Sequence, residues 1–294
     1  MEMPPVSRFL ILLLIAAATV SGPASALEIE ARTLSARKPA GALPDTEIAI
    51  GTRDIVRAWL SGPTVRYAHG VLGDAVEAEA VVAERRDGSV VEFNVGPDAV
   101  IEDRIPRLVD MDADGRDEIM VVRSNLNLGA GLILVGLDGG ELVLKAEAEP
   151  IGMANRWLNP VGVGDFDADG RMEAAVVITP HIGGTLQLYE WRGAKLVPDH
   201  AQRSFSNHAI GSRELGLSAV TDLDGDGTPD IVVPDAGRRA LVGLTFKGGT
   251  YKELFRFDLP GHLASGITAR HRDGRPEIIY KLGDGSTQVL TVKP

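Results

Sequence analysis

The chain of 294 residues contains no cysteine. It can therefore form no disulfide, use no cysteine nucleophile and carry no lipid on a cysteine behind a signal sequence. Other catalytic signatures are missing as well: there is no Gly-x-Ser-x-Gly elbow, no His-Glu-x-x-His pair and no phosphate-binding glycine loop. The sequence thus offers no catalytic residue by motif, and a non-enzymatic role is the favoured interpretation.

Basic residues are too few to form a strongly positive surface. The chain has 30 Lys and Arg against 41 Asp and Glu, which gives a formal net charge of −11. A protein whose main partner is nucleic acid or an anionic membrane needs a basic face. We therefore expect no nucleic-acid partner and no membrane insertion after cleavage of the signal described next.

The apolar run of residues 9–20 is too short to span a bilayer as a helix, which takes about 20 residues. It follows Arg8 and precedes the small residues Ala24, Ser25 and Ala26, an order typical of a cleavable secretory signal. We predict a signal peptide at 1–26, a flexible lead-in at 27–45 and a single domain at 46–294. The mature protein is expected to be a monomer that is periplasmic or secreted.

Three segments share one acidic template. They read DMDADGRDEIMVV from residue 110, DFDADGRMEAAVV from residue 165 and DLDGDGTPDIVV from residue 222. In each loop, acids occupy positions 1, 3, 5 and 9, glycine occupies position 6, and an apolar segment follows. The twelve acids are Asp110, Asp112, Asp114, Glu118, Asp165, Asp167, Asp169, Glu173, Asp222, Asp224, Asp226 and Asp230.

Four carboxylates so close together repel one another unless a counter-charge lies between them. Carboxylates at positions 1, 3 and 5 of a tight loop can converge on Ca²⁺, and the acid at position 9 can close the cage. An EF-hand would need Glu at position 12, where this chain has Val121, Val176 and Val233. The pattern predicts about three Ca²⁺ per chain, in loops between strands. The alternative is that Asp and Gly form ordinary turns that bind nothing.

Repeat spacing predicts the architecture. The closing acids Glu118, Glu173 and Asp230 are 55 and 57 residues apart. Weaker copies, expected to be turns without metal, occur at residues 73–82 and 269–280. Five units of about 50 residues match the period of propeller blades. We therefore predict an all-β fold: a β-propeller of about five four-stranded blades, its ring closed by an N-terminal strand near residues 55–60 that completes the last blade.

Strands within a unit are predicted from apolar runs separated by glycine turns. In the third unit they cover residues 173–178, 185–191 and a segment from residue 195. In the fourth they cover residues 240–246 and 251–255. No helix is expected after the signal.

From residue 73 onward the acidic loops and their apolar exits resemble the FG-GAP/VCBS repeat family, the calcium-loop propeller repeats also found in the heads of integrin α chains. The resemblance implies that the twelve loop acids coordinate Ca²⁺. The Phe-Gly and Gly-Ala-Pro signatures are absent, so the chain is more similar to the VCBS type. The integrin ligand-binding role does not carry over.

The loops at the opposite strand ends contain the candidate ligand-binding residues. Trp157 could stack on a sugar or another ring, and arginines could hold an anionic group. Alternatively, Arg156 and Arg213 brace neighbouring blades. The candidates are Arg123, Arg156, Trp157, His181, His208, Arg213, Glu214 and Arg238.

Two functions of different class follow. The favoured one is a calcium-stabilised binding module for a protein or a glycan. The alternative is a calcium-dependent enzyme acting on polysaccharides, a lyase or hydrolase, for which His208 and Glu214 are the only acid–base pair that the sequence offers.

Overall fold

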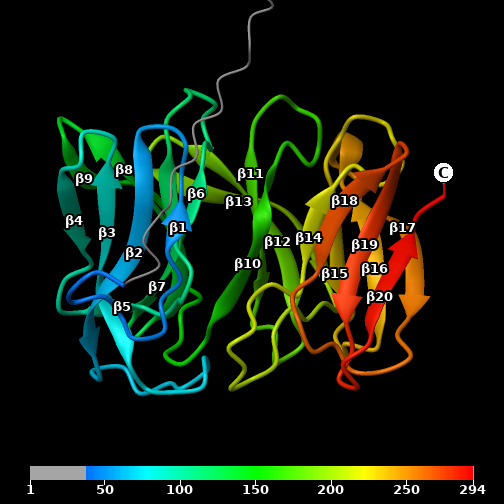
Figure 1. Cartoon of the computed structure of the whole chain (residues 1–294), viewed down its shortest axis with the longest axis horizontal. Coiled ribbons are helices and arrows are strands. Elements are labelled where there is room, and N and C mark those ends of the chain that lie inside the picture. Colours follow the sequence, from blue (N-terminus) through cyan, green and yellow to red (C-terminus); the bar gives the residue numbers. More distant parts are fainter. Residues whose placement is uncertain (1–37, 294) are drawn as a thin grey trace, which may run out of the picture. The chain divides into compact units, whose positions relative to one another are not determined.

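The computed structural model describes residues 38–293, and the predicted signal peptide and residues 27–37 of the lead-in lie outside them. The described part is all-β, with twenty strands, one 3₁₀ turn (Lys247–Gly249) and no α-helix (Figure 1). No helix among these residues is long and apolar enough to cross a bilayer. The predictions of an all-β fold and of no helix after the signal are confirmed for this part of the chain.

The strands form five consecutive groups. The first contains β1 (Ala49–Ile50), β2 (Ile55–Thr64), β3 (Glu77–Arg85) and β4 (Val90–Asn94); β5 (Ala99–Ile101) follows. The second contains β6 (Arg107–Val109), β7 (Glu118–Asn125), β8 (Gly129–Asp138) and β9 (Glu141–Glu147), and the third contains β10 (Leu158–Gly164), β11 (Glu173–Ile178), β12 (Thr185–Arg192) and β13 (Lys195–Arg203). The fourth contains β14 (Ala219–Thr221), β15 (Asp230–Pro234), β16 (Ala240–Thr245) and β17 (Lys252–Asp258), and the fifth contains β18 (Thr268–Arg272), β19 (Arg275–Lys281) and β20 (Thr287–Thr291).

Hydrogen bonding within each group is antiparallel, between strands consecutive in sequence. The first three groups join into a 13-stranded sheet, because β5 pairs with β3 at Ala78 and with β7 along its whole length, and β9 pairs with β13 at Glu147. The fourth and fifth groups are separate sheets of four and three strands. The β3–β5 pairing and the β9–β13 pairing each consist of one residue pair.

The core lies between consecutive groups. Strands that follow the acidic loops are buried over most of their length; all five residues of β15 and all six of β16 are buried. Ala175 and Val177 of β11 pack in one cluster with Ile231 and Val233 of β15. Strands enclosed on both faces need continuous apolar runs rather than alternation, which explains the sequences after each loop.

Local strand predictions agree closely with the structure. Residues 173–178 form β11, residues 185–191 are matched by β12 (Thr185–Arg192), and β13 begins at Lys195. The glycine turns lie where expected, since these apolar runs and glycines are strong local signals. The weak copy at 269–280 is a two-residue turn between β18 and β19, where Asp273 and Gly274 have φ of 51° and 73°.

The predicted role of residues 55–60 in closing the ring is wrong. Residues 55–60 belong to β2, which pairs with β1 and β3 and not with any strand of the last group. The predicted upstream copy at residues 73–82 is also wrong, because these residues lead into β3 and form its first part. The counterpart of the acidic loops in the first group is the β1–β2 connection, residues 51–54. Strand partners depend on contacts distant in sequence, which local patterns do not specify.

The folded part begins before residue 46. Leu43 is 1% exposed in the core, Ala42 forms a β-bridge with Ser61, and the Arg104 Nε lies 2.7 Å from Asp45 Oδ2. The described end of the predicted lead-in is therefore packed against β2 and its neighbours.

Candidate functional site

All three acidic loops connect the first two strands of a group. Their flanking residues pair in the same register: Val109 with Glu118, Gly164 with Glu173, and Thr221 with Asp230. The position-9 acid is thus the first residue of a buried strand in every case. The strand–loop–strand arrangement predicted from the sequence is present.

The loops share one backbone conformation. The carboxylate at position 1 accepts the N–H of the position-6 glycine: Gly115 to Asp110 at 3.1 Å, Gly170 to Asp165 at 3.1 Å and Gly227 to Asp222 at 2.9 Å. Position 6 has φ between 85° and 91°, which glycine adopts without steric cost. Position 4 is also left-handed, with φ of 59° at Ala113, 63° at Ala168 and 80° at Gly225.

The position-9 acids are held in a repeated way. One carboxylate oxygen accepts the N–H of position 2: Met111 to Glu118, Phe166 to Glu173 and Leu223 to Asp230, at 2.8–2.9 Å. Burial raises the pKa of Glu118 to about 7, of Glu173 to about 8 and of Asp230 to about 6. The position-2 N–H opposes this shift, and the charges of the loop aspartates add to it. A bound cation would offset the electrostatic part of this cost.

Ten of the twelve predicted ligands converge. Oxygens within 4.8 Å of one another come from Asp110, Asp112 and Glu118; from Asp165, Asp167, Asp169 and Glu173; and from Asp222, Asp224 and Asp230. Asp226 instead lies 2.9 Å from Lys247 Nζ, and Asp114 accepts the N–H of Arg116. Among residues 38–293 the buried Oδ1 of Asp110 has no hydrogen-bond partner. An oxygen-ligated cation such as Ca²⁺ fits these donors.

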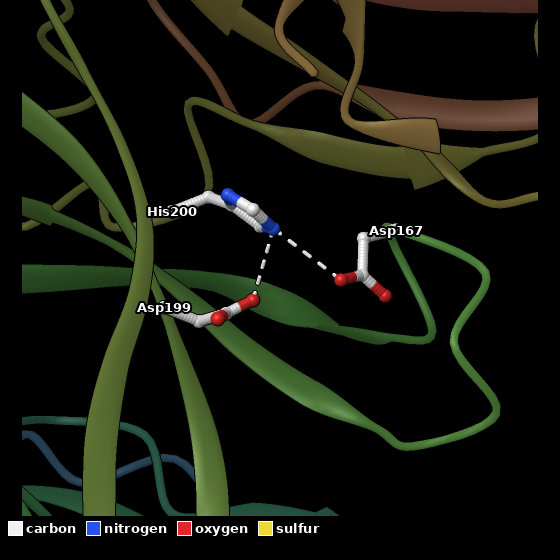
Figure 2. Close-up of side chains that lie close together, drawn as sticks. All are labelled: Asp167, Asp199 and His200. Atoms are coloured by element: carbon white, nitrogen blue, oxygen red, sulfur yellow. Dashed lines mark hydrogen bonds and ion pairs between the residues drawn. The ribbon is translucent and has the colours of Figure 1, made fainter. Parts of the chain in front are cut away.

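Asp167 has a partner that the sequence did not indicate. The His200 Nε2 lies 3.3 Å from Asp167 Oδ2 and 3.0 Å from Asp199 Oδ2 (Figure 2). Because carboxylates only accept, Nε2 carries the proton. The other oxygen, Oδ1, accepts the N–H of Asp169. His200 therefore holds Asp167 from outside the loop, in the way that outer partners orient metal ligands.

A pocket of about 280 Å³ lies among the loops at the other strand ends. Leu158 pairs with Ile178 at the end of β10 and β11 opposite the acidic loop, and the pocket is formed just beyond that pair. Its walls include Arg156, Trp157, His181, Ile182 and Ile210, with His69 from the β2–β3 connection.

The predicted ligand-face residues have different environments. Arg156, Trp157 and His181 line the pocket, and His208 supports it through a hydrogen bond from His181. Glu214 and Arg238 line a neighbouring pocket of about 200 Å³. Arg123 pairs with Glu147, and Arg213 pairs with Asp74, both at 2.6 Å.

Two expectations about this face are wrong. Trp157 is 2% exposed and donates its Nε1–H to the carbonyl of Glu102, so its ring is not a surface for stacking. His208 is fully buried, and its two ring nitrogens contact His181 and Ser212 rather than Glu214. The Glu214 carboxylate accepts the N–H of Gly216.

Two further residues of this region gave no sequence signal. His69 Nδ1 lies 2.6 Å from Oε1 of Glu102, a fully buried carboxylate that also accepts the Ser124 hydroxyl. They come from different connections, so no motif joins them. Only the fold brings them together.

Comparisons with known proteins give no family. No family model and no curated protein matches the chain. Among solved structures it is similar to rhamnogalacturonan lyase YesW (15% identity, 71% of this chain, TM-score 0.41) and to the complex of the fission yeast SREBP and SCAP binding domains (10% identity, 92% of this chain and 80% of that chain, TM-score 0.40). A third, from Bacteroides fragilis, is described as a 6-phosphogluconolactonase (13% identity, 81% of this chain and 66% of that chain, TM-score 0.36).

The chain spans about half the length of the lyase, 49%. Function is therefore inferred from the residues of the two sites.

Proposed function

We propose that the chain is a calcium-stabilised β-propeller of the FG-GAP/VCBS type that acts outside the cytoplasm as a non-enzymatic binding module for a protein or a glycan. The observation that carries the proposal is the threefold repetition of one acidic loop. Its position-1, position-6 and position-9 hydrogen bonds recur with nearly the same lengths.

The strand groups support a propeller of five units. At three of the four junctions between consecutive groups the first strands contact each other: β1 with β6, β10 with β14, and β14 with β18. At the junction of the second and third groups β10 contacts β7, the second strand of its group. Outer strands also touch, β4 with β9 and β9 with β13. First strands that face a common axis, with later strands further out, are the arrangement of propeller blades. The fifth unit has three strands, so the proposed ring contains one incomplete blade.

Calcium is favoured by the donor set. All candidate ligands are carboxylate oxygens, which hard cations prefer, and each loop joins a partly exposed rim to a buried acid. Binding to the native state alone would stabilise the fold. The loops at the opposite strand ends, with their pocket, are then the surface left for a ligand.

The enzyme alternative loses its best candidate pair, because His208 and Glu214 contact other partners. A binding role requires no such pair.

Isothermal titration of metal-stripped mature protein with Ca²⁺ tests the proposal. We expect three ions per chain, falling to two in Asp167→Ala and remaining three in Asp138→Ala, at the exposed last residue of β8. A count of zero or one in the parent protein would reject the calcium-repeat assignment.

A further inference from the structure

Histidine rings line and support the pocket opposite the acidic loops, and their contacts determine which ring nitrogens carry a proton and which are hydrogen-bond acceptors. His208 Nε2 lies 2.9 Å from the carbonyl of Ser212, which can only accept. The Nε2 of His208 therefore carries the proton, and its Nδ1 accepts from His181 Nε2 at 2.8 Å. The remaining nitrogen of His181, Nδ1, is left with a lone pair.

Both rings stay neutral near pH 7. Burial lowers the pKa of His181 and of His208 to about 4, although for His208 the Ser212 carbonyl opposes this effect. The His181–His208 pair therefore offers an uncharged hydrogen-bond acceptor near pH 7. Trp157 lies against both rings, at centroid distances of 6.2 Å to His181 and 4.8 Å to His208, and keeps them in place.

His69 is a second imidazole at the wall. Its Nδ1 is bonded to the buried Glu102, so in the neutral ring Nε2 holds the lone pair. Within residues 38–293 that Nε2 forms no hydrogen bond, and the side chain is 15% exposed. Glu102 itself is fully buried behind the ring, so a ligand meets the imidazole and not the carboxylate.

The pocket also has a cationic and an apolar side. In the described part of the chain Arg156 takes part in no ion pair; its guanidinium donates to the adjacent carbonyl of Asn155. At the rim, Ile182 is 62% exposed and Ile210 is 72% exposed. Two aliphatic side chains so open to water, beside an unpaired arginine, suit a ligand with an apolar group and an anionic group.

We propose that this pocket binds the C-terminal residue of a peptide chain, with its carboxylate on Arg156, its backbone N–H on an imidazole of His69 or His181, and an apolar side chain against Ile182 and Ile210. The inference rests on the proposed binding role and specifies a protein as the ligand. A sugar acid would share the carboxylate, but the ring that would stack on it, Trp157, is buried. The volume of about 280 Å³ suits one residue rather than a long segment.

The test uses Ca²⁺-loaded full-length mature protein and a fluorescein-labelled Gly-Ala-Leu peptide with a free carboxylate, followed by fluorescence anisotropy. The same peptide as a C-terminal amide is the matched probe. We expect the amide to bind at least about 10-fold more weakly, since hydrogen bonds to a charged group are lost. Equal binding of the two peptides would overturn the proposal.

Variants locate the site. Arg156→Gln should reduce binding of the carboxylate peptide to the level of the amide, and Ile210→Ser should weaken both peptides. The control is Arg272→Gln, at an exposed arginine at the end of β18, which should leave binding unchanged. Circular dichroism of each variant checks the fold, and undiminished binding to folded Arg156→Gln would contradict the assignment.

Competition separates possible sources of the carboxylate. N-acetylleucine that competes as well as the peptide would support the same chemistry in a small carboxylic acid. Galacturonate that binds while the peptide does not would overturn the inference in favour of a glycan. Three bound Ca²⁺ without binding of any peptide would reject the pocket assignment alone, whereas failure of the calcium count would reject the proposed function.

Discussion

At the scale of single residues, each acidic loop depends on side chains outside its template. Asp167 is held by His200 of β13, and its backbone carbonyl accepts the N–H of Gly248 from the next group. Asp110 has Arg53 Nη2 at 3.4 Å. These neighbours limit how the carboxylates can turn and so contribute to the geometry that an ion would meet.

The replacement His200→Ala should weaken Ca²⁺ binding at the second loop alone, by about 10-fold, as loss of an outer partner of a metal ligand commonly does. Titration calorimetry should then resolve one weakened site and two unchanged ones. His262→Ala, at an exposed histidine, serves as the control. If all three affinities fall together, His200 acts on global stability rather than on Asp167.

A pH dependence follows from Glu77. This acid is 2% exposed, and burial, followed by the charges of Glu102 and Asp74, raises its pKa from 4.5 to about 9. Between those values the folded state keeps a proton that the unfolded chain has lost. Its contribution to stability is therefore complete below pH 4.5 and is lost as the pH rises through 9.

The substitution Glu77→Gln should remove that dependence and stabilise the protein on the order of 1–3 kcal/mol at pH 8, with little effect at pH 4.5. Urea unfolding at several pH values in saturating Ca²⁺ measures it, because bound ion keeps the contribution of the acidic loops constant. Glu141→Gln, at an exposed position of β9, should change nothing. Parallel pH profiles for parent and Glu77→Gln would contradict the argument.

At the scale of elements, the acidic loops and their strands were largely predictable and the pocket was not. The four acid positions, glycine and apolar exit of each loop lie within a dozen residues, so local chemistry specifies them. By contrast, β1 has only two residues, Ala49 and Ile50, too few to give a strand signal, and β2 was assigned to the wrong group in consequence. His69 and Glu102 are 33 residues apart, and only the packed connections bring them into contact.

The left-handed conformation at position 4 of the loops was not predicted, because two of the three loops have alanine there. Position 4 is left-handed in all three loops, yet only the third has glycine there, Gly225. A left-handed alanine costs roughly 1–2 kcal/mol, partly offset by the greater freedom of glycine in the unfolded chain. Ala168→Gly should therefore be stabilising by up to about 1 kcal/mol.

Chemical denaturation in the presence of Ca²⁺ measures that gain. The matched control is Ala175→Gly, at a fully buried residue of β11, which should be destabilising because the strand loses both packing and backbone restriction. A loss of stability in Ala168→Gly would mean that the alanine side chain makes a contact worth more than the strain.

At the scale of the whole molecule, three ion sites would couple stability to calcium. Extracellular modules of this chemistry bind Ca²⁺ with Kd of about 10⁻⁴–10⁻³ M, so millimolar Ca²⁺ contributes roughly 0.4–1.4 kcal/mol per site. Three sites amount to a few kcal/mol, against about 5–15 kcal/mol for a typical domain.

The melting temperature should accordingly rise through the millimolar Ca²⁺ range and respond much less to Mg²⁺, which prefers a tight octahedral shell. Scanning fluorimetry across both titrations measures this, with chelator as the reference. An unchanged melting temperature between chelator and about 10 mM Ca²⁺ would identify the loops as solvated turns.

The β2–β3 connection, residues 65–76, has a consequence for the order in which the molecule is made. Its Tyr67 hydroxyl accepts the N–H of Asn155, its Val71 carbonyl accepts the N–H of Gly211, and its Asp74 pairs with Arg213, 139 residues later. Although the Tyr67–Asn155 bond needs only residue 155, a growing chain cannot complete this set of contacts until residue 213 has left the ribosome. Until then the cover of Val71 and Leu72 is incomplete, because Leu215 belongs to the cluster that buries them in the finished protein. The pocket face is therefore completed late in synthesis, and an unfinished chain exposes an apolar segment that a chaperone would bind.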